Sequence, residues 1–139
     1  MKIYFAGAIR GGRDDSKIYE NIITYLGNIG QVLTEHVGDH KLDRMGEIGG
    51  IDTAIYQRDM DWLQSADTVV AEVTTPSLGV GYELGIAEKL KKPILCLYRP
   101  SKNKCLSAML KGNKKFCTRE YNTLIEAKSF IDEFFHSLI

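Results

Sequence analysis

Short apolar runs alternate with longer amphipathic stretches along the chain. Strands are expected where apolar residues run almost without interruption, and helices where they recur every three to four positions. Alternation of the two kinds of segment is typical of a βαβ architecture. The expected strands cover residues 2–7, 31–36, 68–73, 93–98 and 115–120. The expected helices cover residues 15–29, 51–65, 79–91, 105–111 and 122–137, and residues 37–50 are expected to form a loop.

The most apolar segments, TVVAEV at 68–73 and PILCLY at 93–98, predict strands that are buried on both faces. Five such strands separated by helices predict one α/β domain over residues 1–139, with a Rossmann-like (flavodoxin-like) doubly wound parallel sheet. With the strand order 2-1-3-4-5, ligands bind beyond the carboxyl ends of the first and third strands. The glycine-rich turns GAIRGG (7–12) and SLGVG (77–81) follow those two strands, so we expect both turns at this crevice.

Two helices each place a carboxylate where an apolar residue is expected. At about 100° per residue, Asp59 falls inside the apolar arc of the helix at 51–65, whereas Asp61 points away. Glu83 falls inside the apolar arc of the helix at 79–91. The apolar residues of these arcs are Ile51, Ile55, Trp62, Leu63 and Ala66 in the first helix, and Val80, Leu84, Ile86, Ala87 and Leu90 in the second. A buried carboxylate is costly, so each of the two needs a partner or a role.

These acids have two interpretations. As structural groups, Glu83 would bond the free amides at the start of its helix, and Asp59 would pair with Arg10 or Arg58. As catalytic groups, one carboxylate would attack or stabilise an anomeric carbon while another group handles protons or holds the sugar. Two inward acids and two turns that converge on one crevice favour glycosyl chemistry.

The two glycine turns are suited to bind a phosphate group at the other end of a sugar substrate. Backbone amides at a helix start bind phosphate when no side chain is in the way. Ser77 adds a hydroxyl group, and Arg10 or Arg13 adds positive charge. The sequence therefore favours a phosphorylated sugar as the ligand.

The composition of the chain limits the kinds of molecule that it is expected to bind. Eighteen Lys and Arg balance eighteen Asp and Glu, so the net charge is zero. This balance argues against a protein that binds nucleic acid or a membrane surface, and it favours self-association. No apolar run approaches the ~20 residues of a membrane span. The three dispersed cysteines, Cys96, Cys105 and Cys117, predict reduced thiols in a protein of the cytoplasm, or in a eukaryote of the nucleus.

The segment EHVGDHKLD (35–43) contains His36 and His40 together with acidic residues. We expect no metal there, because the segment is predicted as a loop and spacing fixes no third ligand. His36 follows the second strand, where it either lines the pocket or is a hydrogen-bonded structural histidine.

Several long blocks of the chain resemble the 2'-deoxynucleoside 5'-phosphate N-hydrolases, a branch of the nucleoside 2-deoxyribosyltransferase superfamily. The resemblance runs from the first strand to about residue 112. Its blocks are YFAGAIRGGR (4–13), LTEHV (33–37), RDMDWLQSADTVVAEVTTPSLGVGYELG (58–85), ILCLYRP (94–100) and LSAML (106–110).

The resemblance implies hydrolysis of the N-glycosidic bond of 2'-deoxynucleoside 5'-monophosphates, without a metal or an organic cofactor. Glu83 matches the nucleophile, which forms a covalent deoxyribosyl ester. Asp59 matches the acid that contacts the sugar and assists proton transfer, and Tyr4 matches the tyrosine that holds the glutamate.

The resemblance also implies a phosphate site formed by Ser77, the amides around Gly79, and Arg10. In the homodimer that it implies, Ser107 of the second subunit completes this site. The substrate-binding positions are Gly7, Ala8, Ile9, Arg10, Gly11, Gly12, Arg13, His36, Ser77, Gly79, Ser107, Ala108 and Met109. One departure is Ala8, where relatives often have serine, and it leaves the preferred base open.

Two other functions stay open at this point. The first is a nucleoside 2-deoxyribosyltransferase that exchanges bases, and the second is a module that binds a nucleotide without turnover. Ser77, Arg10 and Ser107 favour the phosphate-using hydrolase over the transferase. The two inward acids disfavour a non-catalytic module, because carboxylates repel an anionic ligand.

Overall fold

The apolar segments of the chain form the strands of one parallel sheet. The computed structural model describes residues 1–9, 15–38 and 51–139. The strands lie in the order β2-β1-β3-β4-β5, which confirms the predicted topology. They are β1 (Lys2–Ala6), β2 (Gln31–Val32), β3 (Thr68–Glu72), β4 (Ile94–Tyr98) and β5 (Cys117–Glu120). The helices are α1 (Ser16–Leu26), the 3₁₀ helix η1 (Glu35–Gly38), α2 (Asp52–Ser65), α3 (Leu78–Lys89), α4 (Ala108–Lys111) and α5 (Leu124–Ser137).

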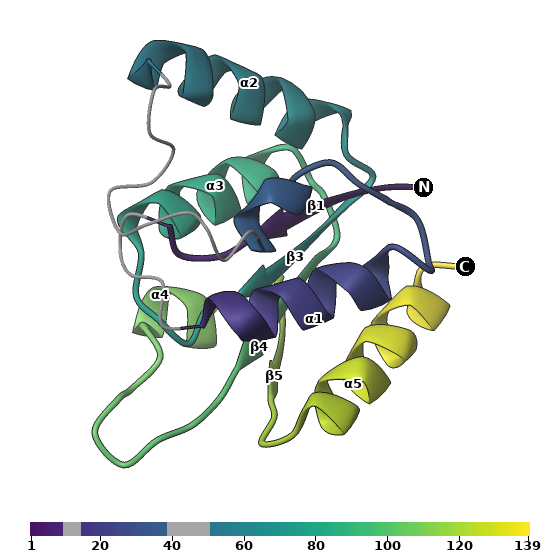
Figure 1. Ribbon diagram of the computed structural model, residues 1–139. Coiled ribbons are helices and arrows are strands. Elements are labelled where there is room, and N and C mark those ends of the chain that lie inside the picture. The colour runs from purple at the N-terminus through teal and green to yellow at the C-terminus, as the bar shows by residue number, and fades with distance from the viewer. Residues whose placement is uncertain (10–14, 39–50) are drawn as a thin grey trace.

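The pleat of the sheet divides the core into two layers. Helices α1 and α5 cover one face, and α2 and α3 cover the other (Figure 1). Ile3 and Phe5 of β1 pack with the α1 and α5 layer, whereas Tyr4 and Ala6 pack with the α2 and α3 layer. Since successive side chains point to opposite faces, the register of β1 directs the phenol of Tyr4 toward α2 and α3.

The strand predicted over residues 31–36 is wrong in its last four residues, because β2 ends at Val32, a turn follows, and η1 begins at Glu35. The buried Thr34 side chain takes the place of ladder bonds. Its Oγ1 accepts from the N–H of Phe5 at 2.8 Å and donates to the carbonyl of Phe5 at 2.7 Å. The N–H of Val37 then donates to the carbonyl of Thr34 at 3.1 Å and closes a turn. Alternating polarity is typical of a strand, but a threonine hydroxyl can substitute for a backbone partner.

Helix α2 packs on the sheet through a narrow face. Within α2 only Leu63 is fully buried, and the buried Ala66 follows the helix. Ile51, which the sequence placed on the inward arc, is 73% exposed because it precedes the helix in extended backbone. Leu90, placed on the inward arc of the next helix, is also exposed. Leu63 is therefore the main apolar anchor of α2.

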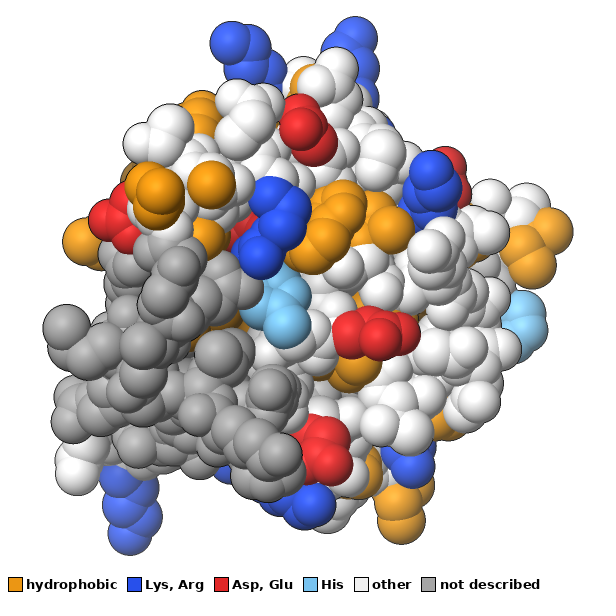
Figure 2. Space-filling model, turned by 45° about the horizontal axis from the view of Figure 1, so that its top comes forward, with side chains coloured by type: hydrophobic (Ala, Val, Ile, Leu, Met, Phe, Trp, Pro, Cys, Tyr) orange, Lys and Arg blue, Asp and Glu red, His pale blue; other side chains and the backbone are white. Residues whose placement is uncertain are grey.

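Charged groups of both signs share the surface. On the face drawn in Figure 2, acidic and basic side chains are interspersed, as the zero net charge leads one to expect. In residues 1–9, 15–38 and 51–139, every helix is too short or too polar to cross a bilayer.

We expect Leu63→Ala to lower the free energy of unfolding by about 2–4 kcal/mol, because it empties the apolar anchor of α2. Urea denaturation measures the change. Ile125→Ala is a control on α5, where the side chain is 81% exposed, and should change stability by less than about 0.5 kcal/mol. Equal losses in the two variants would contradict the assignment of Leu63 as the anchor.

Candidate active site

A hydrogen bond between β1 and α3 lies at the centre of the predicted site. The phenol of Tyr4, which is 1% exposed, donates to Oε2 of Glu83. Glu83 lies beside the buried Leu84 on the inward face of α3, as the helical angle predicts. The two partners are 79 positions apart in the sequence, so the fold alone brings them together.

The environment of Glu83 brings its pKa close to neutrality. Burial raises the pKa of this carboxyl group to about 7; the hydrogen bond from Tyr4 opposes the rise, and the negative charge of Asp59 adds to it. The pKa of Tyr4 lies above its ordinary value because the phenol is buried and faces Glu83, so it remains a proton donor at neutral pH. A carboxyl group with a pKa near neutrality and a fixed donor is typical of a catalytic group.

Asp59 is paired with its neighbour in the chain. Oδ1 of Asp59 accepts from Nε of Arg58 at 3.0 Å and from Nη2 at 2.9 Å. Arg58 is one of the two partners that the sequence analysis named for Asp59 as a structural group. Asp59 nevertheless lies close enough to Glu83 to raise the pKa of the glutamate. The structure thus brings both predicted acids into one electrostatic cluster between α2 and α3.

Arg58 also connects this cluster to η1. Its Nη2 donates to Nε2 of His36 at 3.3 Å, and the guanidinium lies 4.7 Å from the centroid of the Trp62 ring. Because arginine can only donate, Nε2 of His36 accepts, which requires the neutral ring with its proton on Nδ1. Sequence reasoning overlooked Arg58 as the centre of this group. Its spacing of four residues from Trp62, which places both on one helix face, was the available signal.

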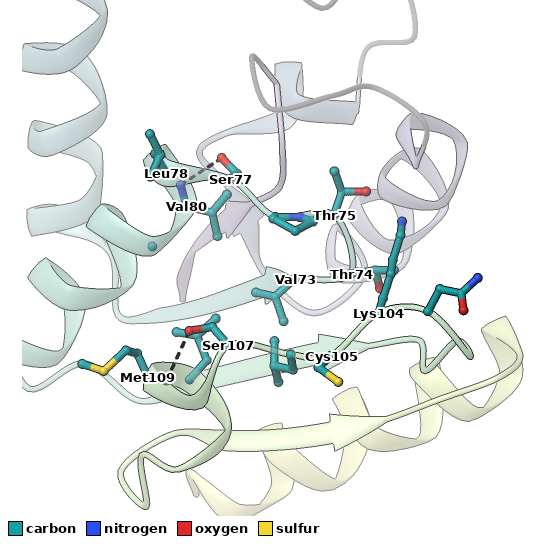
Figure 3. A pocket seen from close by; sticks show the side chains of 15 residues that line it. Val73, Thr74, Thr75, Ser77, Leu78, Val80, Lys104, Cys105, Ser107 and Met109 are labelled. Atoms are coloured by element: carbon teal, nitrogen blue, oxygen red, sulfur yellow. Dashed lines mark hydrogen bonds between the residues drawn. The ribbon is translucent and has the colours of Figure 1, made fainter.

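Two serines start helices beside a cavity. Ser77 caps α3 by accepting from the N–H of Val80 at 3.3 Å, and Ser107 caps α4 by accepting from the N–H of Met109 at 3.2 Å. Both serines line a cavity of about 870 Å³ between the start of α3 and the segment that leads into α4 (Figure 3). Met109 lines the same cavity and is 80% exposed, and the adjacent Ala108 is also exposed.

Helix α3 connects the cavity with the carboxylate cluster. Ser77 precedes the first turn of α3, and Glu83 lies six residues later, about 9 Å further along the axis. A Cβ at Gly79 would meet only Oγ of Ser77, at 3.8 Å, and a Cβ at Gly81 would have no described atom within 4 Å. Packing among the described residues therefore does not require glycine at either position, and the start of α3 is open.

The described part of the first glycine turn, residues 7–9, packs on α1. A Cβ at Gly7 would lie 3.0 Å from the ring of Tyr19, so a side chain there would displace this ring. Ala8 is fully buried and its N–H donates to the hydroxyl of Tyr19 at 3.1 Å, whereas Ile9 packs at the margin of the α1 layer. Tyr19 is a supporting residue that sequence reasoning overlooked. The predicted site residues Arg10, Gly11, Gly12 and Arg13 lie outside the described residues.

Among the residues that the structure describes, His, Cys, Asp and Glu form no group of three or more that could hold a metal ion. His40 lies outside the described residues.

The sheet order and helix arrangement are shared with a solved structure. The structure of the CMP N-glycosidase of Clostridium botulinum superposes with a TM-score of 0.70, at 20% identity, over 96% of this chain and 99% of that chain. The chain belongs to the nucleoside 2-deoxyribosyltransferase family, whose model matches residues 3–128. This match confirms the resemblance inferred from the sequence blocks.

Two relatives are much more similar in sequence. The 5-hydroxymethyl-dUMP N-hydrolase of Rattus norvegicus is 48% identical over 141 residues, which cover 99% of this chain and 86% of the rat protein. A protein of Nematostella vectensis named as a putative 2'-deoxynucleoside 5'-phosphate N-hydrolase is 56% identical over 125 residues, 86% of this chain and 84% of that protein.

We expect Tyr4→Phe to raise the pKa of Glu83 above the wild-type value of about 7, because the variant removes the hydrogen bond that stabilises the ionised carboxylate. Carbon-13 NMR titration of the glutamate carboxyl groups measures this pKa. Tyr25→Phe is the matched control, since Tyr25 bonds Asp132 at 2.8 Å elsewhere in the molecule. An unchanged or lower pKa in Tyr4→Phe would contradict this account of the pair.

Proposed function

We propose that the protein hydrolyses the N-glycosidic bond of 2'-deoxynucleoside 5'-monophosphates to a free base and 2-deoxyribose 5-phosphate. The observation that carries this proposal is the Glu83 carboxyl group, which is held by Tyr4 and has a pKa near neutrality. The names of the rat and Nematostella relatives support the same reaction. Because the rat relative is named for 5-hydroxymethyl-dUMP, this nucleotide is the first substrate to test.

In the proposed reaction the ionised Glu83 attacks C1' of the sugar. A bond forms between Oε and C1', the bond from C1' to the base nitrogen breaks, and the base leaves with that electron pair and takes up a proton. Water then attacks C1' and gives up a proton, which balances the one taken up by the base. The bond from C1' to Oε breaks and releases Glu83 as the carboxylate, with 2-deoxyribose 5-phosphate as the product. Neither step uses a metal ion or an organic cofactor.

Tyr4 and Asp59 assist Glu83 in this scheme. Tyr4 orients the carboxylate, and its hydrogen bond limits the rise in the pKa of Glu83 that burial causes. Asp59 contacts the sugar and assists proton transfer, while Arg58 supplies the balancing positive charge. Protonation removes the nucleophile, so kcat/KM falls as the pH drops below the pKa of Glu83.

The phosphate group binds at the open start of α3 in this proposal. Ser77 and the free amides around Gly79 are the donors, and helix α3 adds the favourable end of its dipole. Arg10 adds positive charge. The remaining predicted substrate contacts, including His36, surround the sugar and the base.

A second copy of the chain completes the phosphate site through the partner subunit's Ser107. Exposed apolar side chains at the cavity support this homodimer: Leu78 is 97% exposed and Met109 is 80% exposed. Such side chains on one face are typical of a protein interface. The absence of net charge also favours self-association, and a cytoplasmic location remains the prediction from cysteine usage.

We expect Glu83→Gln to lower kcat for base release from 5-hydroxymethyl-dUMP and dGMP by at least about 10³-fold, because the amide is a poor nucleophile. Liquid chromatography of the released base measures the rate. Glu88→Gln is the control on the same helix, where Glu88 bonds Asn113 at 3.0 Å, and should retain the wild-type rate.

Wild-type base release by Glu83→Gln would overturn the assignment of the nucleophile. Adding a second free base to the wild-type assay separates hydrolysis from base exchange. Accumulation of a new nucleotide in place of 2-deoxyribose 5-phosphate would identify a transferase.

Subunit mixing tests the shared site. Ser107→Ala and Glu83→Gln should each be nearly inactive, since each lacks one part of every site. Random mixing should restore about a quarter of wild-type activity, because half of the dimers are mixed and each has one intact site. Activity of the mixture equal to the mean of the two parents would show that Ser107 does not act across an interface.

A further inference from the structure

A buried polar cluster lies on the opposite side of the sheet from Glu83. Glu72, the last residue of β3, is fully buried. Its Oε2 accepts from the hydroxyl of Tyr121, and its Oε1 accepts from the N–H of Thr74 at 2.6 Å. Alternation along β3 directs this carboxyl group to the α1 and α5 layer, where Tyr121 packs.

Arg99, which follows β4, connects this cluster to the start of α1. Its Nη2 is paired with Oδ1 of Asp15, and its Nε lies 3.7 Å from Oε2 of Glu72. The backbone N–H of Arg99 donates to Oγ1 of Thr74 at 2.9 Å. The hydroxyl of Thr75 donates to the other oxygen of Asp15 at 2.8 Å. One carboxylate thus binds both an arginine and a threonine from separate segments.

The position of Asp15 makes these bonds unusual. Asp15 precedes α1, where an aspartate side chain commonly caps the helix, yet it makes no such bond. Its side chain is directed to Thr75 and Arg99 instead, and Asp15 is only 7% exposed. Local helix formation therefore does not account for this buried carboxylate.

The cluster joins the start of α1 to the turn that precedes α3. Asp15 lies at the end of the segment that begins with the first glycine turn, and Thr75 lies two residues before Ser77. Thr74 is bonded to Glu72 and to the backbone of Arg99, so both residues that precede Pro76 are bonded to the cluster.

We propose that Asp15, Arg99 and Thr75 are positioning residues that hold the turn before α3 against the start of α1 and so determine affinity for the 5'-phosphate of the substrate. Glu72 and Tyr121 support Arg99 from within the core. This inference rests on the proposed function. Thr75 lines the same cavity as Ser77, but its hydroxyl is bonded to Asp15, and in this proposal it makes no bond to the phosphate. The positioning residues act through Ser77 and the free amides at the start of α3.

The geometry predicts an effect on KM with little effect on kcat. Glu83 is held by Tyr4 on the other face of the sheet, so loosening the cluster leaves the nucleophile in place. The turn before α3 would become more mobile. Phosphate binding would have to order it again, and the entropy lost in that ordering would lower affinity.

The test is Thr75→Val, which keeps the shape of the side chain and removes the bond to Asp15. We expect KM for 5-hydroxymethyl-dUMP to rise about five- to tenfold, as for the loss of one buried hydrogen bond, with kcat changed by less than about twofold. Thr118→Val on β5 is the matched control, because Oγ1 of Thr118 has no hydrogen-bond partner among the described residues. It should leave both constants unchanged.

Two further measurements do not require turnover. Hydrogen exchange of the backbone amides at residues 77–81 should be faster in Thr75→Val than in the Thr118→Val control. Calorimetry should show about five- to tenfold weaker binding of 2-deoxyribose 5-phosphate. Arg99→Lys, which keeps the charge but loses the planar fork, should weaken binding in the same direction.

Failure of the two proposals can be told apart. A wild-type protein that binds 2-deoxyribose 5-phosphate but releases no base would overturn the proposed function alone. Wild-type KM, affinity and exchange in Thr75→Val would overturn the positioning role alone, as would a fall in kcat without a change in KM. A wild-type protein that binds no sugar phosphate would overturn both.

Discussion

The hydrogen bond from Tyr4 to Glu83 is the contact on which the site depends. Burial between the sheet and two helices favours the neutral form of the glutamate, whereas the phenol favours the ionised form. The result is a carboxyl group that can change protonation near neutral pH while its orientation is fixed from the central strand. Because Tyr4 is itself buried and in the middle of β1, the sheet cannot form without placing this donor opposite α3.

The pleat of the sheet places the proposed catalytic residues on one face and the proposed positioning residues on the other. Tyr4 on β1 points to the face that holds Glu83, and Glu72 on β3 points to the face that holds Arg99 and Asp15. The two groups of ionisable residues are thereby separated by the sheet. Their nearest connection is the chain segment that leads from β3 into α3, so substitutions in one group affect the other mainly through the backbone.

The sequence was sufficient for the parallel α/β sheet, because near-continuous apolar runs that alternate with helical periodicity are typical of it. The strand order 2-1-3-4-5 was a condition taken from a common doubly wound arrangement, and the structure has that order. The sequence was also sufficient for the inward direction of Glu83, since this follows from helical angle alone. It was not sufficient for Thr34, whose hydroxyl replaces ladder bonds, or for the pairing of Asp15, because local pattern indicates a helix cap there. The connections of Arg58 depend on η1, a turn that the alternating pattern concealed. Such bonds between distant segments leave no periodic trace in a sequence.

At the open start of α3, constraints from packing within the chain can be distinguished from constraints that a ligand or a partner subunit imposes. Since Gly79 and Gly81 contact so little of the described chain, small side chains there can be accommodated without displacing the core. Any intolerance of substitution at these positions must then originate outside the described residues, and a ligand or a neighbouring subunit would impose it. Variation among natural homologues at these two glycines would therefore report on recognition, whereas variation at Gly7, which lies against Tyr19, would report on packing.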